Sequence, residues 1–283
     1  MPTLSRTLAL LTACLAATAA HGQETVSLAR ADGQSVPAVA YAPAGPRCQG
    51  IAVVSPGAGG SEKGYGYLAR AMSDQGYLAI VAGHVESGPR ALRSRIREEG
   101  LREGLAELVA DPQAYRARLM DVAAARAWAA SRCPGGDAIL LGHSMGAATA
   151  LIEAGARNRL AVHGRDAFDA YVVLSPQGPG SVFPEQAWRG IAKPVLSITG
   201  TRDGGQDRTD WHARTLAFAD MRPGCKWLAV IDGATHLNFA GLGLGQARVE
   251  EATVSVLRSF LLARGQDGCT PPDPPGRVEI RAK

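Results

Sequence analysis

The feature that most constrains the fold is a series of short apolar runs separated by longer helical patterns. Several runs are rich in Val, Ile and Leu and do not alternate with polar residues, which is typical of parallel strands covered on both faces. Strands that alternate with helices predict an α/β fold with a mostly parallel, doubly wound sheet. The runs are Ile51–Ser55, Tyr77–Ala82, Ala138–Gly142, Ala170–Leu174, Val195–Thr199 and Trp227–Ile231, and the helical patterns are Tyr65–Gln75, Gln113–Ser131, Met145–Arg157, Trp211–Asp220 and Ala247–Arg264.

The domain organisation follows from the length of 283 residues, which suits one large α/β domain. Two short runs that flank an Asp-Gly turn, Glu24–Leu28 and Val36–Tyr41, predict an antiparallel hairpin at its start. The charged segment Ser87–Ala110 predicts one further helix. We expect the domain to span residues 23–264, followed by a Pro-rich, extended or disordered tail over 265–283.

The first 22 residues have the pattern of an export signal. Arg6 supplies a positive start, and the uncharged Leu8–Ala20 stretch is too short to span a bilayer. Cleavage after Ala20 or Gly22 predicts a periplasmic or secreted protein without a transmembrane segment. The alternative is a lipoprotein anchored at Cys14, because Leu11–Cys14 resembles a lipobox.

The residues Gly142–Gly146 match the pattern G-x-S-x-G, with Ser144 at its centre. The motif follows an apolar strand and opens an Ala-rich helix, and a strand-to-helix elbow presents a serine Oγ on a strained turn. Glycine on both sides lets the helix and the strand approach closely. Ser144 is therefore the candidate nucleophile, and the alternative is a serine that only caps a helix.

A serine hydroxyl is a poor nucleophile until a base takes its proton, and in elbow enzymes the acid and then the histidine follow the serine in the chain. His236 follows the last apolar run and is the candidate base. Asp203 follows the preceding run and is the candidate acid, with Asp207 as its main alternative. Asp232 has the position of a turn former.

The oxyanion of such a reaction needs two backbone donors. Met145 N–H, directly after the nucleophile, is the first candidate. The second is Ala58 in the Gly-rich turn at 56–61, with Gly57 or Gly59 as alternatives. A phosphate-binding loop does not fit, because the lysine that follows this turn precedes glycine rather than Ser or Thr.

These motifs occur in the order and spacing of the α/β-hydrolase superfamily, and the chain resembles it over about Gly50 to Arg264. It looks most like bacterial esterases grouped with dienelactone hydrolases and platelet-activating-factor acetylhydrolases, and it is similar to polyester and cutinase-type hydrolases. The resemblance implies about eight mostly parallel strands and no metal or organic cofactor. The motifs are Pro56–Ser61, Gly142–Gly146, Gly200–Asp203 and Gly233–His236.

Two positions depart from the family pattern. Dienelactone hydrolases use a cysteine nucleophile where this chain has Ser144, and Pro56 replaces the histidine that commonly precedes the oxyanion glycine. The expected function is therefore a serine hydrolase of carboxylic esters that forms an acyl-enzyme. An amidase or thioesterase with the same triad is the nearest alternative, and a non-catalytic binding protein of the same fold is another.

The four cysteines that remain after signal removal predict disulfides in an exported chain. In the α/β-hydrolase arrangement Cys48 and Cys133 precede neighbouring parallel strands, so we expect Cys48–Cys133 and Cys225–Cys269. The alternative is four reduced, buried thiols. No two cysteines have the spacing of a chelating pair, so we expect no metal site.

The expected partner is a small-molecule or lipid-like ester. Phe183 and Trp188 follow a strand at the predicted active edge and are candidates either for lining its pocket or for the core. The formal charge is +4 and the Lys and Arg residues are scattered, so we expect no nucleic-acid partner. The sequence predicts neither the acyl chain length nor the oligomeric state.

Overall fold

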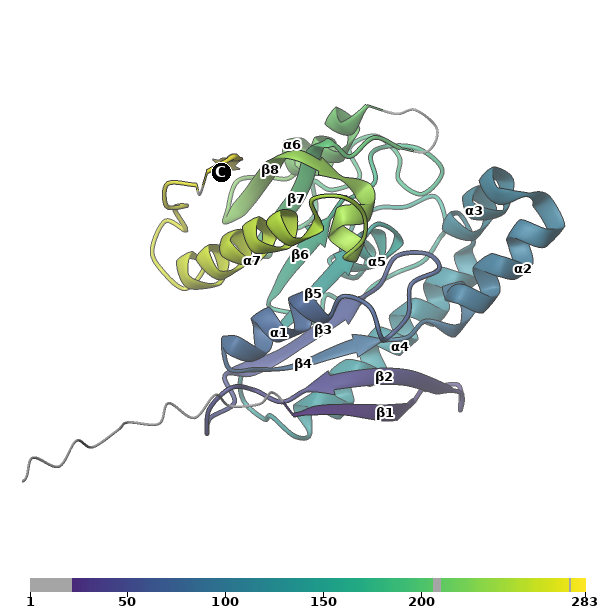
Figure 1. The fold of residues 1–283 in the computed structure, drawn as a ribbon, viewed down its shortest axis with the longest axis horizontal. Coiled ribbons are helices and arrows are strands. Elements are labelled where there is room, and N and C mark those ends of the chain that lie inside the picture. The colour runs from purple at the N-terminus through teal and green to yellow at the C-terminus, as the bar shows by residue number, and fades with distance from the viewer. Residues whose placement is uncertain (1–21, 206–209, 275) are drawn as a thin grey trace, which may run out of the picture.

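A nine-stranded sheet forms the centre of the computed structural model, which describes residues 22–205, 210–274 and 276–283. Its order is β1-β2-β4-β3-β5-β6-β7-β8-β9, and the strands from β4 to β8 in this order are parallel (Figure 1). The predicted α/β fold with a mostly parallel sheet is confirmed. The strands are β1 Gln23–Ala29, β2 Ser35–Tyr41, β3 Gly50–Ser55, β4 Tyr77–Ala82, β5 Asp137–His143, β6 Ala170–Leu174, β7 Val195–Arg202, β8 Lys226–Thr235 and β9 Val278–Ala282.

Helices cover both faces of this sheet (Figure 1). On one face lie α1 (Gly66–Asp74) and α7 (Gln246–Ala263), and on the other lie α4 (Pro112–Ala130) and α5 (Met145–Glu153). The Asp111 side chain accepts hydrogen bonds from the first backbone N–H groups of α4, which explains where this helix begins. The remaining α-helices in the described ranges are α2 (Pro89–Glu99), α3 (Leu101–Val109) and α6 (Leu216–Asp220).

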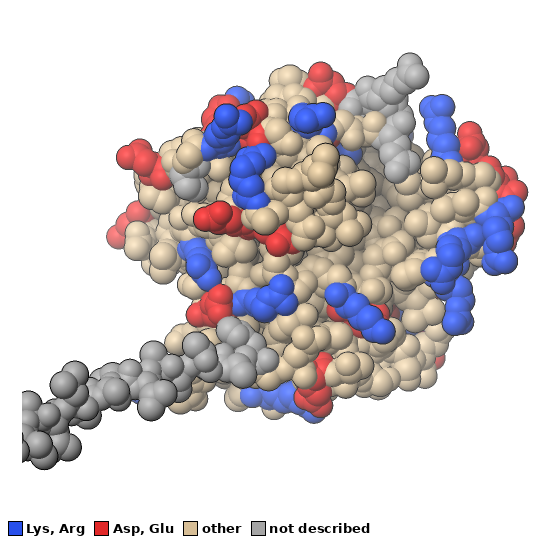
Figure 2. All heavy atoms as spheres, viewed as in Figure 1, with Lys and Arg blue, Asp and Glu red and all other residues tan. Residues whose placement is uncertain are grey.

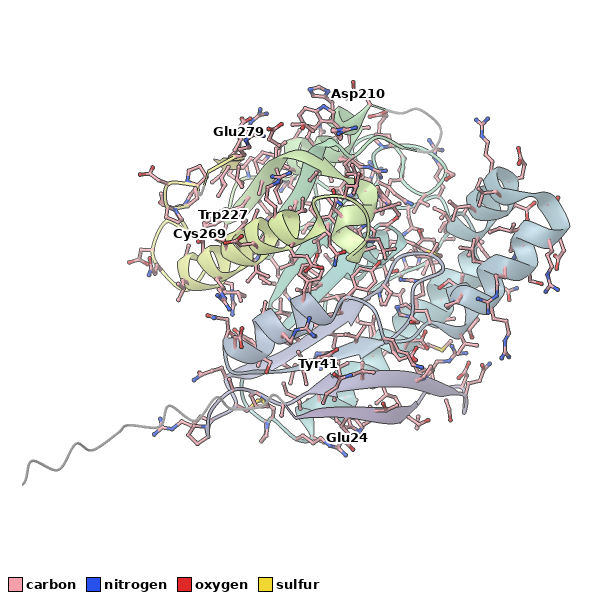
Figure 3. The ribbon with its side chains drawn as sticks, viewed as in Figure 1. Glu24, Tyr41, Asp210, Trp227, Cys269 and Glu279 are labelled. Atoms are coloured by element: carbon pink, nitrogen blue, oxygen red, sulfur yellow. A yellow bond between two sulfur atoms is a disulfide. The ribbon has the colours of Figure 1, made fainter. Side chains whose placement is uncertain are left out.

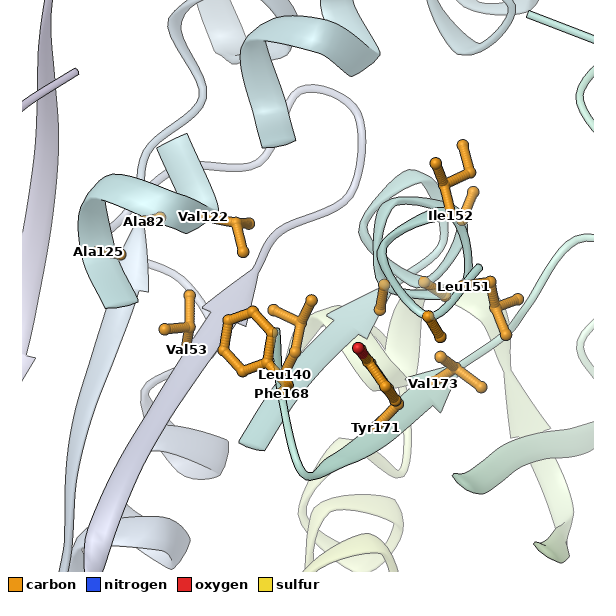
Figure 4. Packing of buried hydrophobic residues seen from close by; sticks show 14 of the residues in the cluster. Val53, Ala82, Val122, Ala125, Leu140, Leu151, Ile152, Phe168, Tyr171 and Val173 are labelled. Atoms are coloured by element: carbon orange, nitrogen blue, oxygen red, sulfur yellow. The ribbon is translucent and has the colours of Figure 1, made fainter. Parts of the chain in front are cut away.

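The core has two layers, one on each side of the sheet. Val53 and Leu140 face α4 and α5, whereas their neighbours Val54 and Leu141 face α1 and α7, and all four side chains are fully buried. Figure 4 shows the first layer, where Val122 and Leu151 from the helices pack over the strands. Burial on both faces is the physical reason why these strands lack polar alternation.

The N-terminal hairpin is antiparallel, as predicted, with Leu28 opposite Val36. One other expectation is wrong. The segment Ser87–Ala110 forms two helices rather than one, because the chain turns at Gly100 with a φ of 85° that favours glycine. The C-terminal tail, expected to be extended or disordered, ends in the extended strand β9, which pairs antiparallel with β8 and gives the sheet nine strands where about eight were expected.

Two disulfides join Cys48 to Cys133 and Cys225 to Cys269, with Cα atoms 5.7 Å and 5.3 Å apart. These are the two pairs expected from the sequence. Figure 3 shows Cys269 beside Trp227, whose indole N–H donates to the Cys269 carbonyl at 2.8 Å. The second disulfide and this bond tie the segment after α7 to the edge of the sheet.

The surface carries mixed charge on the face drawn in Figure 2. The hairpin of α2 and α3 holds many of its basic side chains, with acidic ones beside them; Arg95, for example, pairs with Glu107 and Asp111. No helix among the described residues is long and apolar enough to cross a membrane. The expected signal over residues 1–22 lies almost entirely outside the described residues.

Candidate active site

The carboxyl ends of four parallel strands bring the sequence-predicted residues to one edge of the sheet. The turn at 56–61 follows β3, Ser144 follows β5, Asp203 follows β7 and His236 follows β8. Ligand sites of open α/β sheets form at this edge, because the loops that leave neighbouring parallel strands meet there. The fold therefore gathers residues that lie up to 180 positions apart in the chain.

Ser144 occupies a strained turn between β5 and α5. Its φ of 53° and ψ of −115° lie outside the regions that L-residues favour. Two glycines make the turn possible: a Cβ at Gly142 would lie 2.1 Å from the Gly146 carbonyl oxygen, and a Cβ at Gly146 would lie 1.9 Å from that of Ser55. The backbone thus has the geometry of a nucleophile elbow.

His236 and Asp203 form a hydrogen-bonded pair beside this elbow. His236 Nδ1 lies 2.9 Å from Asp203 Oδ1, and the Asp203 side chain is fully buried. Thr199 Oγ1 donates to the other carboxylate oxygen at 2.8 Å, and Arg214 Nε lies 3.6 Å from Oδ1. In this pair Nδ1–H is the donor and the carboxylate the acceptor, which leaves Nε2 as the ring nitrogen available to accept a proton.

Local geometry holds the loop that carries His236. The side-chain oxygen of Asn238 accepts from the Thr235 backbone N–H at 2.9 Å, which begins the short 3₁₀ helix His236–Ala240. A register shift between β7 and β8 precedes it, where Gly200 lies so close to Ala234 that a Cβ would meet its carbonyl oxygen at 2.3 Å. A larger residue than glycine at position 200 would push the carboxyl ends of β7 and β8 apart.

His143, the residue before Ser144, contacts the hydrogen-bonded pair of His236 and Asp203. Its ring centroid lies 4.7 Å from that of His236, and its Nδ1 lies 2.8 Å from the Tyr65 hydroxyl. Burial lowers the pKa of His143 well below its usual value, and the nearby Arg214 acts in the same direction, so this ring is neutral. No hydrogen bond joins Ser144 and His236, both of which are described; such bonds are often long before substrate binds.

The backbone N–H groups of the Gly-rich turn differ in whether they already have a hydrogen-bond acceptor. Gly57 N–H donates to the Tyr65 hydroxyl at 3.1 Å, and Gly59 N–H donates to the Ser87 carbonyl at 2.8 Å. Ala58 N–H has no partner among the hydrogen bonds of the described residues. Met145 is the first residue of α5, where a helical N–H has no acceptor within the helix. Ala58 and Met145 thus retain the free donors, in preference to Gly57 and Gly59.

The remaining sequence candidates lie elsewhere. Phe183 and Trp188 are 0% and 1% exposed, and their rings pack against each other in the core 5.2 Å apart, so they are not pocket residues. Asp232 is exposed and accepts from the Thr201 hydroxyl at 3.1 Å, as expected of a turn residue. Asp207, the alternative acid, lies outside the described residues.

The sequence reasoning missed three side chains that the fold adds to the site, namely Tyr65, Thr199 and Arg214. None of them belongs to a recognisable motif, because each acts through a contact made only after folding. A cavity of about 540 Å³ is lined by Gly60 and Ser61 of the Gly-rich turn and by the beginning of α2, but Ser144, Asp203 and His236 are not among its lining residues. Within the described ranges, no three His, Cys, Asp or Glu side chains form a group that could hold a metal ion.

Comparison with known proteins rests on structure. No family model and no curated protein sequence matches the chain. A dienelactone hydrolase from Anabaena variabilis is similar at a TM-score of 0.57 and 18% identity, over 83% of this chain and 96% of that one. Est1E from Butyrivibrio proteoclasticus has a TM-score of 0.59 at 15% identity, over 85% and 98%.

A cold-adapted esterase from an Arctic intertidal metagenomic library has a TM-score of 0.57 at 17% identity, over 83% of this chain and 92% of that one. All three likenesses extend over nearly the full length of the solved structures, and the mostly parallel sheet with helices on both faces agrees with them. The chain therefore has the α/β-hydrolase fold.

Proposed function

We propose that the protein is a serine-dependent hydrolase of carboxylic esters that works through an acyl-enzyme. The observation that carries the proposal is the buried Asp203 bound to His236 at 2.9 Å, beside Ser144 on a strained elbow. A nucleophile, a base next to it and a third group that orients the base are the parts that this chemistry needs. The esterase names of the structural neighbours agree with it.

In the first half of the proposed reaction, Ser144 Oγ attacks the ester carbonyl carbon while His236 Nε2 takes the hydroxyl proton. Asp203 holds the imidazole in the tautomer with its proton on Nδ1 and stabilises the cation that forms. The carbonyl oxygen becomes an oxyanion, which accepts hydrogen bonds from Ala58 N–H and Met145 N–H. The C–O bond to the alcohol then breaks, and His236 returns the proton to the departing alcohol.

In the second half, water attacks the acyl-Ser144 ester with His236 as the base. The same two backbone donors hold the second oxyanion, and its collapse releases the carboxylic acid and restores the Ser144 hydroxyl. Both halves place negative charge at the same point, so donors fixed in advance serve both steps. We propose a small-molecule or lipid-like ester as the substrate, bound near the turn that carries Ala58.

We also propose that the protein is exported. Two disulfides favour an oxidising compartment, since cytosolic thiols are kept reduced. Expression of the full chain in a bacterium with an export pathway, followed by mass measurement of the purified protein, tests this. A mature chain that begins near Gln23 supports export by ordinary cleavage; an intact chain found only in the cytoplasm contradicts it.

The test of the activity combines a covalent probe with an ester panel. A fluorophosphonate should label the parent and Ser131→Ala, whose serine is exposed at the end of α4, but not Ser144→Ala. Hydrolysis of p-nitrophenyl acetate, butyrate and octanoate should show the same dependence, with matched thioester and anilide substrates in the panel. Equal labelling or equal hydrolysis by Ser144→Ala would disprove the proposal.

A further inference from the structure

Arg118 on α4 is a fully buried arginine that the proposed reaction does not use. Arginine is almost never buried without compensation, because removing its charge from water costs several kcal/mol. Its guanidinium is hydrogen-bonded to three separate parts of the chain, one of which begins the turn that carries Ala58. The question is therefore what these contacts hold in place.

Each nitrogen of the guanidinium has a hydrogen-bond partner. Nε donates to Thr149 Oγ1 on α5 at 2.9 Å, and Nη1 donates to Ser87 Oγ at 2.7 Å. Nη2 donates to Ser55 Oγ at 3.0 Å and to the carbonyl oxygen of Pro56. Ser55 is the last residue of β3 and Pro56 begins the turn that carries Ala58. A single planar group thus joins the nucleophile helix to the oxyanion turn.

Two of these partners extend the link to the donors themselves. Thr149 Oγ1 donates in turn to the carbonyl oxygen of Met145 at 2.9 Å. The carbonyl of Ser87 accepts from Gly59 N–H at 2.8 Å, next to Ala58. One proposed donor, Met145, is itself part of a chain of hydrogen bonds that ends on Arg118. The other, Ala58, is the sequence neighbour of Gly59, which belongs to a second such chain.

A chain of hydrogen bonds leads from Arg118 to a buried carboxylate. Ser55 Oγ lies 2.9 Å from His84 Nε2, and His84 Nδ1 lies 2.8 Å from Asp121 Oδ2. Asp121 also accepts from Arg30 at 3.2 Å. Burial and the Arg118 charge lower the pKa of His84 to about 4, so the ring is neutral and passes the bonding from Ser55 to Asp121.

Ser55, His84 and Asp121 are hydrogen-bonded to one another as the members of a catalytic triad are, but a substrate cannot reach them. Ser55 is fully buried and its oxygen already accepts a hydrogen bond from Arg118, so no substrate carbonyl can reach it. These three side chains instead complete the hydrogen bonding of the buried Arg118 guanidinium. A buried polar network of this kind rigidifies its surroundings when all its members are satisfied.

We infer that Arg118 is a positioning residue that fixes the oxyanion turn against the nucleophile helix, and so sets the separation of the Ala58 and Met145 N–H groups. The inference rests on the proposed function and adds a residue to it. Oxyanion donors act because they are fixed before the charge develops. Loss of Arg118 should therefore weaken transition-state binding more than substrate binding.

The test compares Arg118→Met with the parent in p-nitrophenyl acetate hydrolysis and in binding of a trifluoromethyl ketone, which forms a tetrahedral oxyanion adduct on the serine. We expect kcat to fall by about 10- to 100-fold with little change in KM, because misplacement by about 1 Å can cost about 10²-fold. Affinity for the ketone should fall by a similar factor. Arg118→Lys should recover only part of the loss, since an ammonium cannot span all the partners.

Lys226→Met is the matched control, because Lys226 is also buried and its ammonium donates to the carbonyls of Ala192, Lys193 and Gly224 at the other end of the sheet. It should lower Tm without changing kcat or ketone affinity. Thr149→Val removes the hydrogen bonds that join Arg118 to Met145, and it replaces Arg118→Met as the test if that variant does not fold. We expect kcat and ketone affinity to fall less than in Arg118→Met, again with little change in KM.

The outcomes separate the inference from the proposed function. If the parent is labelled by a fluorophosphonate at Ser144 but Arg118→Met and Thr149→Val keep the parent kcat and ketone affinity, the inference is wrong and the proposed function stands. If Lys226→Met reproduces the loss of kcat, the effect is one of stability and the inference is likewise wrong. A parent that is not labelled overturns the proposed function and the inference together.

Discussion

Gly146, the second glycine of the elbow, offers a perturbation whose size can be worked from the structure. An alanine there would place Cβ 1.9 Å from the Ser55 carbonyl oxygen and 2.9 Å from that of Pro56, both of them backbone atoms that cannot rotate away. Because Cβ contacts shorter than 3.0 Å essentially do not occur, α5 and the end of β3 must separate by about 1 Å. We expect about 1–3 kcal/mol of lost stability from overpacking.

The same displacement should cost about 10²-fold in kcat, because it moves Met145 N–H away from the turn that carries Ala58. Urea unfolding and p-nitrophenyl acetate hydrolysis of Gly146→Ala measure the two effects. Gly265→Ala is the control, since its Cβ would meet only the Leu262 carbonyl oxygen at 3.9 Å and both values should stay near those of the parent. A Gly146→Ala protein with parental stability and kcat would refute the close-approach argument.

Three further changes test other parts of the structure. Asp203→Asn should lower kcat by about 10⁴-fold while circular dichroism stays unchanged, because the amide stabilises the wrong tautomer of His236; a loss below about tenfold would exclude Asp203 as the orienting acid. Acidification should destabilise the protein, because the pKa of His84 is lowered from 6.5 to about 4 in the folded state and the unfolded state therefore binds more protons between these pH values. Urea unfolding at pH 5 should give a free energy of unfolding about 2 kcal/mol lower than at pH 7. The His84→Gln variant should show a smaller difference. Replacing both Cys48 and Cys133 by alanine should cost about 2–5 kcal/mol in urea unfolding with kcat unchanged, since the disulfide lies at the amino ends of β3 and β5, opposite Ser144; an unchanged midpoint would contradict this.

Sequence reasoning worked best where one local pattern has one structural solution. The centres of strands such as β3 and β5 are apolar without alternation because both of their faces are buried, and that pattern predicted the parallel sheet. The motif around Ser144 predicted the elbow, because its two glycines and the strand before it are contiguous in the chain. Asp203 and His236 could be named because each follows a strand whose carboxyl end must lie at the same edge.

The sequence was less informative where burial and pairing depend on distant partners. It left Phe183 and Trp188 open between the pocket and the core, and only the structure places them in the core. The β9 segment is polar and short, and it becomes a strand only because the edge of β8 is free to pair with it. The segment Ser87–Ala110 was expected to form one helix, but the positive φ of Gly100 ends α2 and starts α3.

The sequence by itself determined the class of fold, the elbow and the candidate triad, since each depends on short-range order and on the direction in which parallel strands run. Only the tertiary structure decided that Ala58 N–H remains free while its neighbours are bonded, and that Arg118 is buried between two elements. The physical reason is that hydrogen-bond satisfaction and desolvation are properties of packed neighbours. A single arginine in a helical sequence pattern predicts neither its hydrogen-bond partners nor its burial.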